Sequence, residues 1–153
     1  MQILGIRNST TCIRYAVVNW DGKNATLVNA SDESRLNFPA ATEEIADKLV
    51  WLKAELEGIF RKYPDIKHVA IKMNQFGMEK MANRHSTHMD GAVMLVSQLN
   101  DKTASTLLYA NIEKGMSSKK IQTYSEDKVG RSSKYWNPQM ADAIAAAWTR
   151  RDR

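Results

Sequence analysis

Cysteine and long apolar runs are scarce in this sequence of 153 residues. Cys12 is the single cysteine, so no internal disulfide can form, and its apolar surroundings are typical of a core residue. No stretch approaches the roughly 20 apolar residues that cross a bilayer. The first residues also lack the basic and then apolar pattern of a secretory signal. We therefore expect a cytoplasmic protein in a reducing compartment, with no membrane partner.

Acidic residues are fewer than basic ones: the sequence has 17 Asp and Glu and 22 Lys and Arg, which gives a net charge of +5. The charge is uneven: residues 113–153 contain nine Lys or Arg and five Asp or Glu, and so hold +4 of the total. This basic protein has two interpretations, a surface that contacts phosphates or a solvated surface that aids solubility. The length suits one domain over residues 1–153.

The N-terminal part predicts a small antiparallel meander. Residues 3–6 and 12–20 are rich in Ile, Val, Tyr and Trp, which favours strands. The pair at 21–22 is Asp-Gly, a strong hairpin signal, and a third strand is expected at 25–28. Residues 31–39 read as a polar connection.

Helices and strands alternate in the rest of the chain. Thr42 is the expected N-cap of a first helix, whose apolar residues recur every three or four positions up to Tyr63-Pro64. A short strand is expected at 69–73, a second helix at 88–99 and a buried strand at 106–110.

The C-terminal part predicts one more helix. Residues 114–133 are polar and basic, which indicates a long loop or a short helix flanked by loops. Asn137 as N-cap and Pro138 at the first helical position then open a final helix. The order β-β-β-α-β-α-β-α predicts an α/β fold, a mixed sheet with helices on both faces.

Three segments resemble the RuvC branch of the RNase H-like superfamily. They are the opening ILGIR at 3–7, HVAIK at 68–72 and the final PQMADAIAAAWT at 138–149. The resemblance spans nearly the whole chain and implies an RNase H-like fold of RuvC type. Among described groups, the chain is most similar to small bacterial RuvC-like proteins.

The resemblance also implies a metal site, and the sequence departs from it. In the family the first strand ends in Asp, the central strand ends in Glu, and the last helix has two Asp three positions apart. The corresponding residues here are Arg7, Lys72, Gln139 and Asp142. Arg and Lys cannot ligate the two divalent metals that the family's carboxylates hold. We therefore predict a degenerate site with no catalytic residue, no metal and no other cofactor.

The same substitutions predict an internal network. If the fold is that of the family, Arg7, Lys72 and Asp142 converge, and the two cations stand where metals would stand. In the other interpretation both cations are solvated strand-end charges that never meet Asp142.

A basic site on this fold favours binding of DNA or RNA without hydrolysis, or a role as interaction subunit of a nucleic-acid-processing or defence assembly. Tyr124, Tyr135 and Trp136 lie among the cations and are candidates for stacking on bases, although Trp136 equally suits a core anchor. The predicted phosphate contacts are Arg7, Lys72, Arg84, Lys119, Lys120, Lys128, Arg131 and Lys134.

Two other functions remain open. An active nuclease with Mg²⁺ or Mn²⁺ needs a replacement carboxylate beside Asp142, and the candidates are Asp21, Glu79, Asp90 and Glu126. A purely structural protein–protein module would make the basic tail only surface.

Two further patterns suggest sites. His85 and His88 would share a helix face and, with Asp90 or Glu79, have the donor types of a transition-metal site. A methionine cluster indicates either core or a protein interface, and a homodimer through the helix at 88–99 is one such interface. The cluster contains Met73, Met78, Met81, Met89 and Met94.

Overall fold

A computed structural model describes residues 1–31, 34–75 and 80–152. Its centre is a six-stranded mixed sheet in the order β3-β2-β1-β5-β6, with β4 paired to β2 off this path. The strands are β1 (Gln2–Asn8), β2 (Cys12–Trp20), β3 (Ala25–Leu27), β4 (Arg35–Asn37), β5 (Ile66–Lys72) and β6 (Thr103–Leu107).

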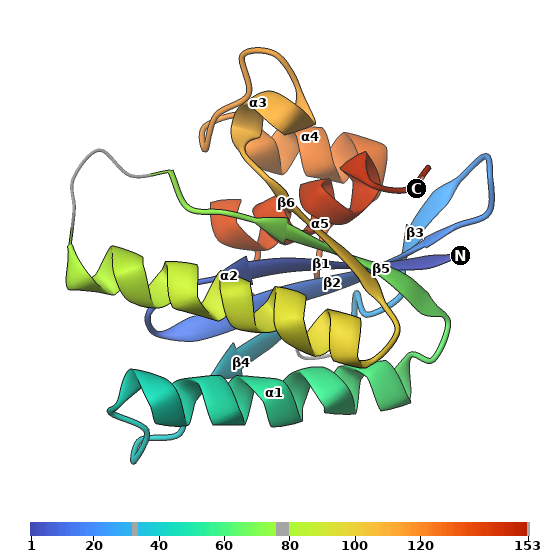
Figure 1. Ribbon diagram of the computed structural model, residues 1–153. Helices are drawn as coiled ribbons and strands as arrows, with labels where there is room; N and C mark the ends of the chain where they lie inside the picture. Colours follow the sequence, from blue (N-terminus) through green and yellow to red (C-terminus); the bar gives the residue numbers. More distant parts are fainter. Residues whose placement is uncertain (32–33, 76–79, 153) are drawn as a thin grey trace.

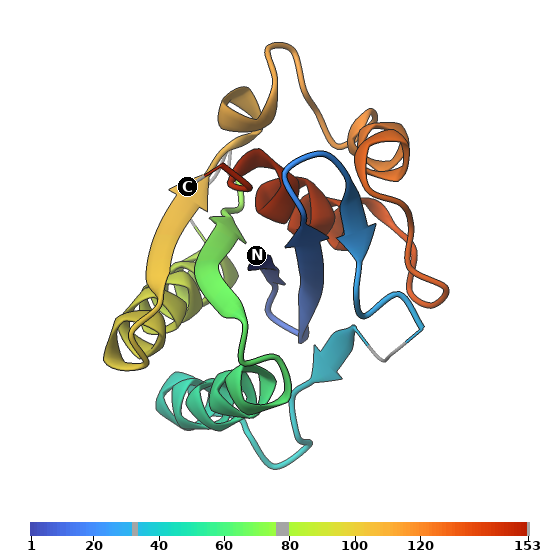
Figure 2. The same cartoon turned by 90° about the vertical axis from the view of Figure 1, so that its right-hand side faces the viewer.

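Helices cover both faces of the sheet, as the sequence predicts (Figure 1). One face packs against α1 and α2, and the other packs against α5, with α3 and α4 beyond it; Figure 2 shows the same layers from the side. No helix among the described residues is long and apolar enough to cross a membrane. The helices are α1 (Ile45–Lys62), α2 (Met81–Leu99), α3 (Tyr109–Ile112), α4 (Ile121–Lys128) and α5 (Pro138–Thr149).

The strand β1 lies at the middle of the sheet, and its last residues belong to the candidate site. It pairs antiparallel with β2 and parallel with β5, so β1 and β5 end at the same edge. The helix α5 packs directly on its backbone, because a Cβ at Gly5 would lie 1.8 Å from the carbonyl oxygen of Ala143. This close approach brings the residues after Gly5 and the first turns of α5 together.

The helix α5 begins as predicted. Asn137 is extended, its side-chain oxygen accepts a hydrogen bond from the Met140 amide at 2.8 Å, and Pro138 follows it. Because the helix is buried between the sheet and α4, all residues from 140 to 147 are buried.

Several expected boundaries are wrong. The polar connection at 31–39 contains β4, whose residues pair with the start of β2, although residues 32–33 lie outside the description. Thr42 is not the cap of α1, because the helix begins at Ile45 after an extended Glu44 that makes no side-chain cap bond. The helix α2 begins at Met81, ahead of the predicted 88.

The strand predicted at 106–110 lies three residues earlier in the sequence. The observed β6 covers Thr103–Leu107, and two of its hydroxyl residues bond the buried His68 imidazole, Thr103 at 2.6 Å and Ser105 at 2.8 Å. Because three of its five residues are Thr or Ser, β6 lacks the apolar run that is typical of a buried strand. The short helix within 114–133 is confirmed as α4.

Candidate functional site

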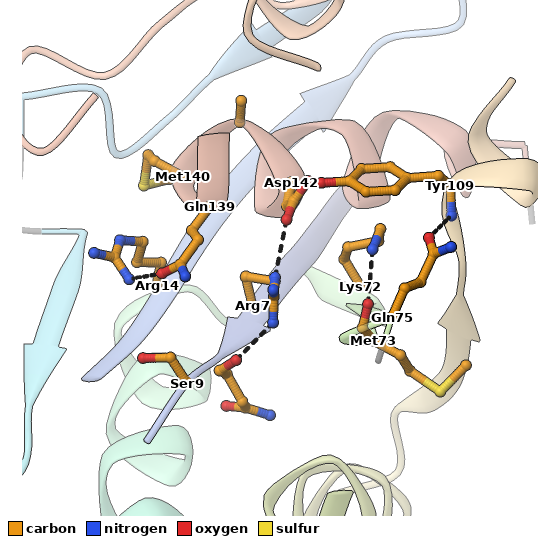
Figure 3. A network of polar contacts seen from close by, with 12 residues as sticks. Arg7, Ser9, Arg14, Lys72, Met73, Gln75, Tyr109, Gln139, Met140 and Asp142 are labelled. Atoms are coloured by element: carbon orange, nitrogen blue, oxygen red, sulfur yellow. Dashed lines mark hydrogen bonds and ion pairs between the residues drawn. The ribbon is translucent and has the colours of Figure 1, made fainter. Parts of the chain in front are cut away.

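An ion pair joins β1 to α5 at the edge where β1 and β5 end (Figure 3). The Nε of Arg7 donates to Oδ2 of Asp142 at 2.9 Å, and Nη1 of Arg7 donates to the Asn8 carbonyl at 2.8 Å. The two side chains are 11% and 2% exposed, so the pair is largely shielded from water.

Lys72 completes this cluster from the end of β5. Its ammonium donates to the Met73 carbonyl at 2.7 Å and lies 3.7 Å from the centre of the Tyr109 ring (Figure 3). The side chain is 1% exposed, and burial lowers its pKa from 10.5 to about 8. Asp142 opposes that decrease, while the neighbouring charge of Arg7 adds to it.

Asp142 lies between these groups. Burial raises the pKa of its carboxyl above the usual value, and both Arg7 and Lys72 act in the opposite direction. The Tyr109 hydroxyl points toward the same carboxylate (Figure 3). Burial raises the pKa of Tyr109, and the negative charge of Asp142 adds a smaller increase.

A second buried carboxylate, Asp90 of α2, borders the cluster. Its Oδ1 accepts a hydrogen bond from Nδ2 of Asn8 at 2.7 Å. Burial raises the pKa of Asp90 to about 6, and Asn8, Arg7 and Lys72 each act against this rise. The cluster therefore has two cations and two carboxylates, and its formal charges cancel when all four are ionised.

Gln139 has a different partner from its neighbours. Its side-chain oxygen accepts a hydrogen bond from Nη1 of Arg14 on β2 (Figure 3). The same nitrogen donates to the Cys12 sulfur at 3.0 Å. Burial lowers the pKa of Arg14, with smaller effects of the same sign from Arg35 and Arg7. Sequence reasoning missed Arg14, although its even spacing from Ala16 and Val18 places it on the α5 side of the strand.

The cations near α4 are separate from this cluster. All five are exposed, on α4 and on its flanking loops, and among the described residues none makes a hydrogen bond or ion pair with Arg7, Lys72 or Asp142. These residues are Lys119, Lys120, Lys128, Arg131 and Lys134.

The aromatic residues nearby have mixed surroundings. Trp136 packs against buried residues of α5, which supports its role as a core anchor. The Tyr135 ring lies 3.9 Å below the Arg35 guanidinium, and the Tyr124 ring lies 5.9 Å from the Lys128 ammonium.

The carboxylates considered as replacements differ in position. Asp21 is exposed in the hairpin, where it accepts the amide N–H groups of Lys23 and Asn24, and Glu126 is exposed 4.0 Å from Arg131. Only Asp90 lies in the buried cluster, and Glu79 lies outside the described residues.

The first turns of α2 contain Arg84, which is exposed, and the two histidines. The rings of His85 and His88 lie 6.4 Å apart, as expected for a shared face. In the part of the chain that the structure describes, no group of three or more His, Cys, Asp or Glu side chains could hold a metal ion.

The methionines are divided between core and surface. Met89 is fully buried, Met81 and Met94 are exposed on the same helix, Met73 is half-buried, and Met78 lies outside the described residues.

No family model matches the sequence, and no curated protein matches it either. Solved structures do match. Thermus thermophilus RuvC in complex with Holliday junction substrate aligns with a TM-score of 0.78 over 97% of this chain and 92% of that chain, at 16% identity. The fold is RuvC-like. The RuvC-like fold also aligns with the yeast mitochondrial Holliday junction resolvase Ydc2, at TM-score 0.63 and 12% identity over 97% of this chain and 78% of that one. Fowlpox virus resolvase with substrate Holliday junction DNA aligns with a TM-score of 0.60 and 11% identity, over 99% of this chain and 97% of that chain.

Proposed function

We propose that this RuvC-like chain binds nucleic acid without metal-dependent hydrolysis, as a binding or interaction subunit of a nucleic-acid-processing or defence assembly. The observation that supports the proposal most is the 2.9 Å ion pair between Arg7 and Asp142, beside the buried ammonium of Lys72. At the shared end of β1 and β5, cations occupy the centre of the site.

The donor set does not fit a pair of divalent metals. Mg²⁺ and Mn²⁺ take oxygen ligands, whereas the Arg7 guanidinium and the Lys72 ammonium are donors only. One oxygen of Asp142 already accepts the Arg7 N–H, and a dication would repel both neighbouring cations. The proposal therefore includes no resident metal and no other cofactor.

The proposed ligand is DNA or RNA. Two solved neighbours of similar fold are described as complexes with Holliday junction substrate, which supports a phosphodiester ligand for this scaffold. Lys72 is fully buried and would act through its field, whereas the other cations are reachable to different degrees. The proposed phosphate contacts are Arg7, Arg84, Lys119, Lys120, Lys128, Arg131 and Lys134, and Lys72 contributes its charge from beneath them.

The direct test is fluorescence anisotropy of labelled single-stranded, duplex and four-way-junction DNA, and of RNA, across a salt series in EDTA. We expect binding that weakens steeply as salt rises, because each phosphate contact releases condensed counterions. The same samples with Mg²⁺ or Mn²⁺ should remain uncut. An absence of binding at low salt would contradict the proposal.

A charge-matched variant tests the site itself. Arg7→Gln with Asp142→Asn removes one charge of each sign, so the net charge is unchanged while the ion pair disappears. We expect weaker binding, and Lys67→Gln should bind like the wild type, because Lys67 is exposed at the opposite end of β5. Equal binding by all three proteins would remove Arg7 from the interface.

One observation favours the alternative of an active nuclease. Asp90 is a second carboxylate that interacts electrostatically with Arg7 and Lys72, so oxygen ligands are not confined to Asp142. That function requires cleavage with Mg²⁺ or Mn²⁺ that disappears in both Asp142→Asn and Asp90→Asn. Cleavage that survives both changes would come from a contaminating enzyme.

We also propose self-association through α2. Met81, Leu95 and Leu99 are 67%, 61% and 68% exposed on this helix, and exposed apolar side chains of this size mark interfaces. Sedimentation velocity tests this with Leu95→Asp against Val50→Asp, a control at a residue that is 70% exposed on α1. A dimer that both variants retain would have a different interface, and a monomeric wild type would reject the proposal.

A further inference from the structure

Three arginines lie side by side across neighbouring strands. Arg7 of β1 is the register partner of Arg14 of β2, and Arg14 is the register partner of Arg35 of β4. Side chains of directly opposed residues in antiparallel pairs point to the same face, and adjacent strands lie about 4.8 Å apart. On the other side of β1, Lys72 of β5 is next to Arg7, one position beyond the pair formed by Ile6 and Ile71. We call Arg7, Arg14 and Arg35 the arginine row.

The arginine row lies on the α5 side of the sheet. Two positions from Arg14, Ala16 packs against Met140 and Ala143 of α5, and alternate residues of a strand share a face. The side-chain bonds agree, because Arg14 reaches Gln139 and Arg7 reaches Asp142, both on that helix.

Such a row has an electrostatic cost. Like charges directly opposite one another in a sheet are destabilising, and both Arg7 and Arg35 lower the pKa of Arg14. Among the described residues, Asp142 is the one carboxylate that forms an ion pair with the row. Arg14 donates to the neutral amide of Gln139 and to the Cys12 sulfur, and Arg35 lies over the Tyr135 ring.

Donor groups in the row are left over. The Nε atoms of Arg14 and Arg35 are buried and have no hydrogen-bond acceptor among the described residues. Arg14 itself is only 8% exposed. Buried donors without an acceptor are costly, so these two N–H groups add to the electrostatic cost of three adjacent cations, which negative charge near the row would reduce.

The outer end of the row is open to a ligand. Arg35 is half-buried, and its guanidinium lies 3.9 Å from the centre of the Tyr135 ring, just ahead of α5. Tyr135 is also half-buried, so an aromatic ring lies beside this end of the row. Basic side chains in a line with an aromatic ring beside them are the components of sites for single strands, where phosphates follow the cations and a base stacks on the ring.

We infer that a single nucleic-acid strand contacts Arg35 beside Tyr135 and leads toward Arg7, with its phosphates attracted by the combined charge of the arginine row. The inference rests on the proposed function and adds Arg35 as a contact and the buried Arg14 as a charge behind it. Guanidinium groups suit this role, because their planar forks bind phosphate oxygens bidentately. The negative charge of the phosphates reduces the repulsion within the row.

The experiment compares Arg35→Gln, Arg35→Lys and Lys67→Gln, titrated against a labelled deoxythymidine single strand over a salt series. For Arg35→Gln we expect a dissociation constant about tenfold higher and a salt slope smaller by about 0.7, the value for one phosphate on a single strand. Arg35→Lys should keep the slope but lose part of the affinity, because it retains the charge without the fork. Lys67→Gln should match the wild type in both. Circular dichroism confirms that each variant is folded.

The outcomes separate the two levels of the argument. A wild type that binds no strand overturns the proposed function. A wild type that binds, with Arg35→Gln indistinguishable from Lys67→Gln, overturns the arginine row alone. Inorganic phosphate is the second probe. If it raises the melting temperature of the wild type at constant ionic strength, while Arg35→Gln binds the strand as the wild type does, the row is a site for free phosphate. That result also rejects the strand as its ligand.

Discussion

Replacing Arg7 by Gln should expose how the buried cluster is stabilised. The substitution removes the cation that donates to Asp142 at 2.9 Å, while the carboxylate stays 2% exposed beside Lys72. Glutamine retains hydrogen-bonding capacity and similar length, so the main change is electrostatic. Asp142 is left as a buried charge without its ion-pair partner.

The expected loss is large at neutral pH. Removing one partner of a buried pair typically costs about 3 to 5 kcal/mol, and we expect about 3 kcal/mol here because Lys72 still attracts the carboxylate. Adding Asp142→Asn removes the uncompensated charge, so the double variant should recover most of that loss. The recovery distinguishes an uncompensated charge from poor packing of the new glutamine.

The loss should also depend on pH. Burial holds the folded-state pKa of Asp142 above its usual value, and removal of Arg7 raises it further. Where the folded state binds a proton that the unfolded state has released, stability falls as pH rises through the folded pKa. The Arg7→Gln loss should therefore be smaller at about pH 5 than at about pH 7, and Asp142→Asn should abolish the difference.

Urea denaturation of the wild type, both single variants and the double variant at these two pH values measures the free energies of unfolding. A loss below about 1 kcal/mol at neutral pH, with no pH dependence, would place Arg7 among exposed ion pairs and refute the reasoning.

Three further substitutions test the packing and the caps. Lys72→Met should stabilise the protein by about 1 to 2 kcal/mol near pH 7, because burying the ammonium costs more free energy than its contacts return. The gain should shrink as pH rises from about 8, the folded pKa, to 10.5, because the folded lysine loses its proton there while the unfolded lysine still binds it. Urea denaturation across this pH range measures the effect, and a destabilised variant would contradict it. Gly5→Ala should cost about 3 kcal/mol or more through its clash with α5, whereas Gly91→Ala, with open space around its Cβ, should gain about 0.5 to 1 kcal/mol in a helix; equal melting temperatures would refute the close packing. Asn137→Ala should cost about 1 kcal/mol as a lost cap, while Thr42→Ala changes thermal stability little, and the reverse order would mean that the caps are misassigned.

The helix α5 shows which features a sequence makes plain. Asn137 and Pro138 specify its start by local chemistry, because a cap and a first-turn proline act within a few residues. The strand β6 shows the opposite case. Its hydroxyl residues belong to a strand because they meet His68 on the neighbouring strand, and no local pattern indicates that contact.

The candidate site is divided in the same way. The sequence by itself determined which residue types stand at the ends of β1 and β5 and in α5, and therefore that cations outnumber carboxylates at Arg7, Lys72 and Asp142. Only the tertiary structure decided that Arg7 pairs with Asp142, that Asp90 reaches the cluster, and that Arg14 connects Arg7 to Arg35. The physical reason is that strand register and helix packing are long-range properties, set by burial of whole faces rather than by the residues that end up in contact.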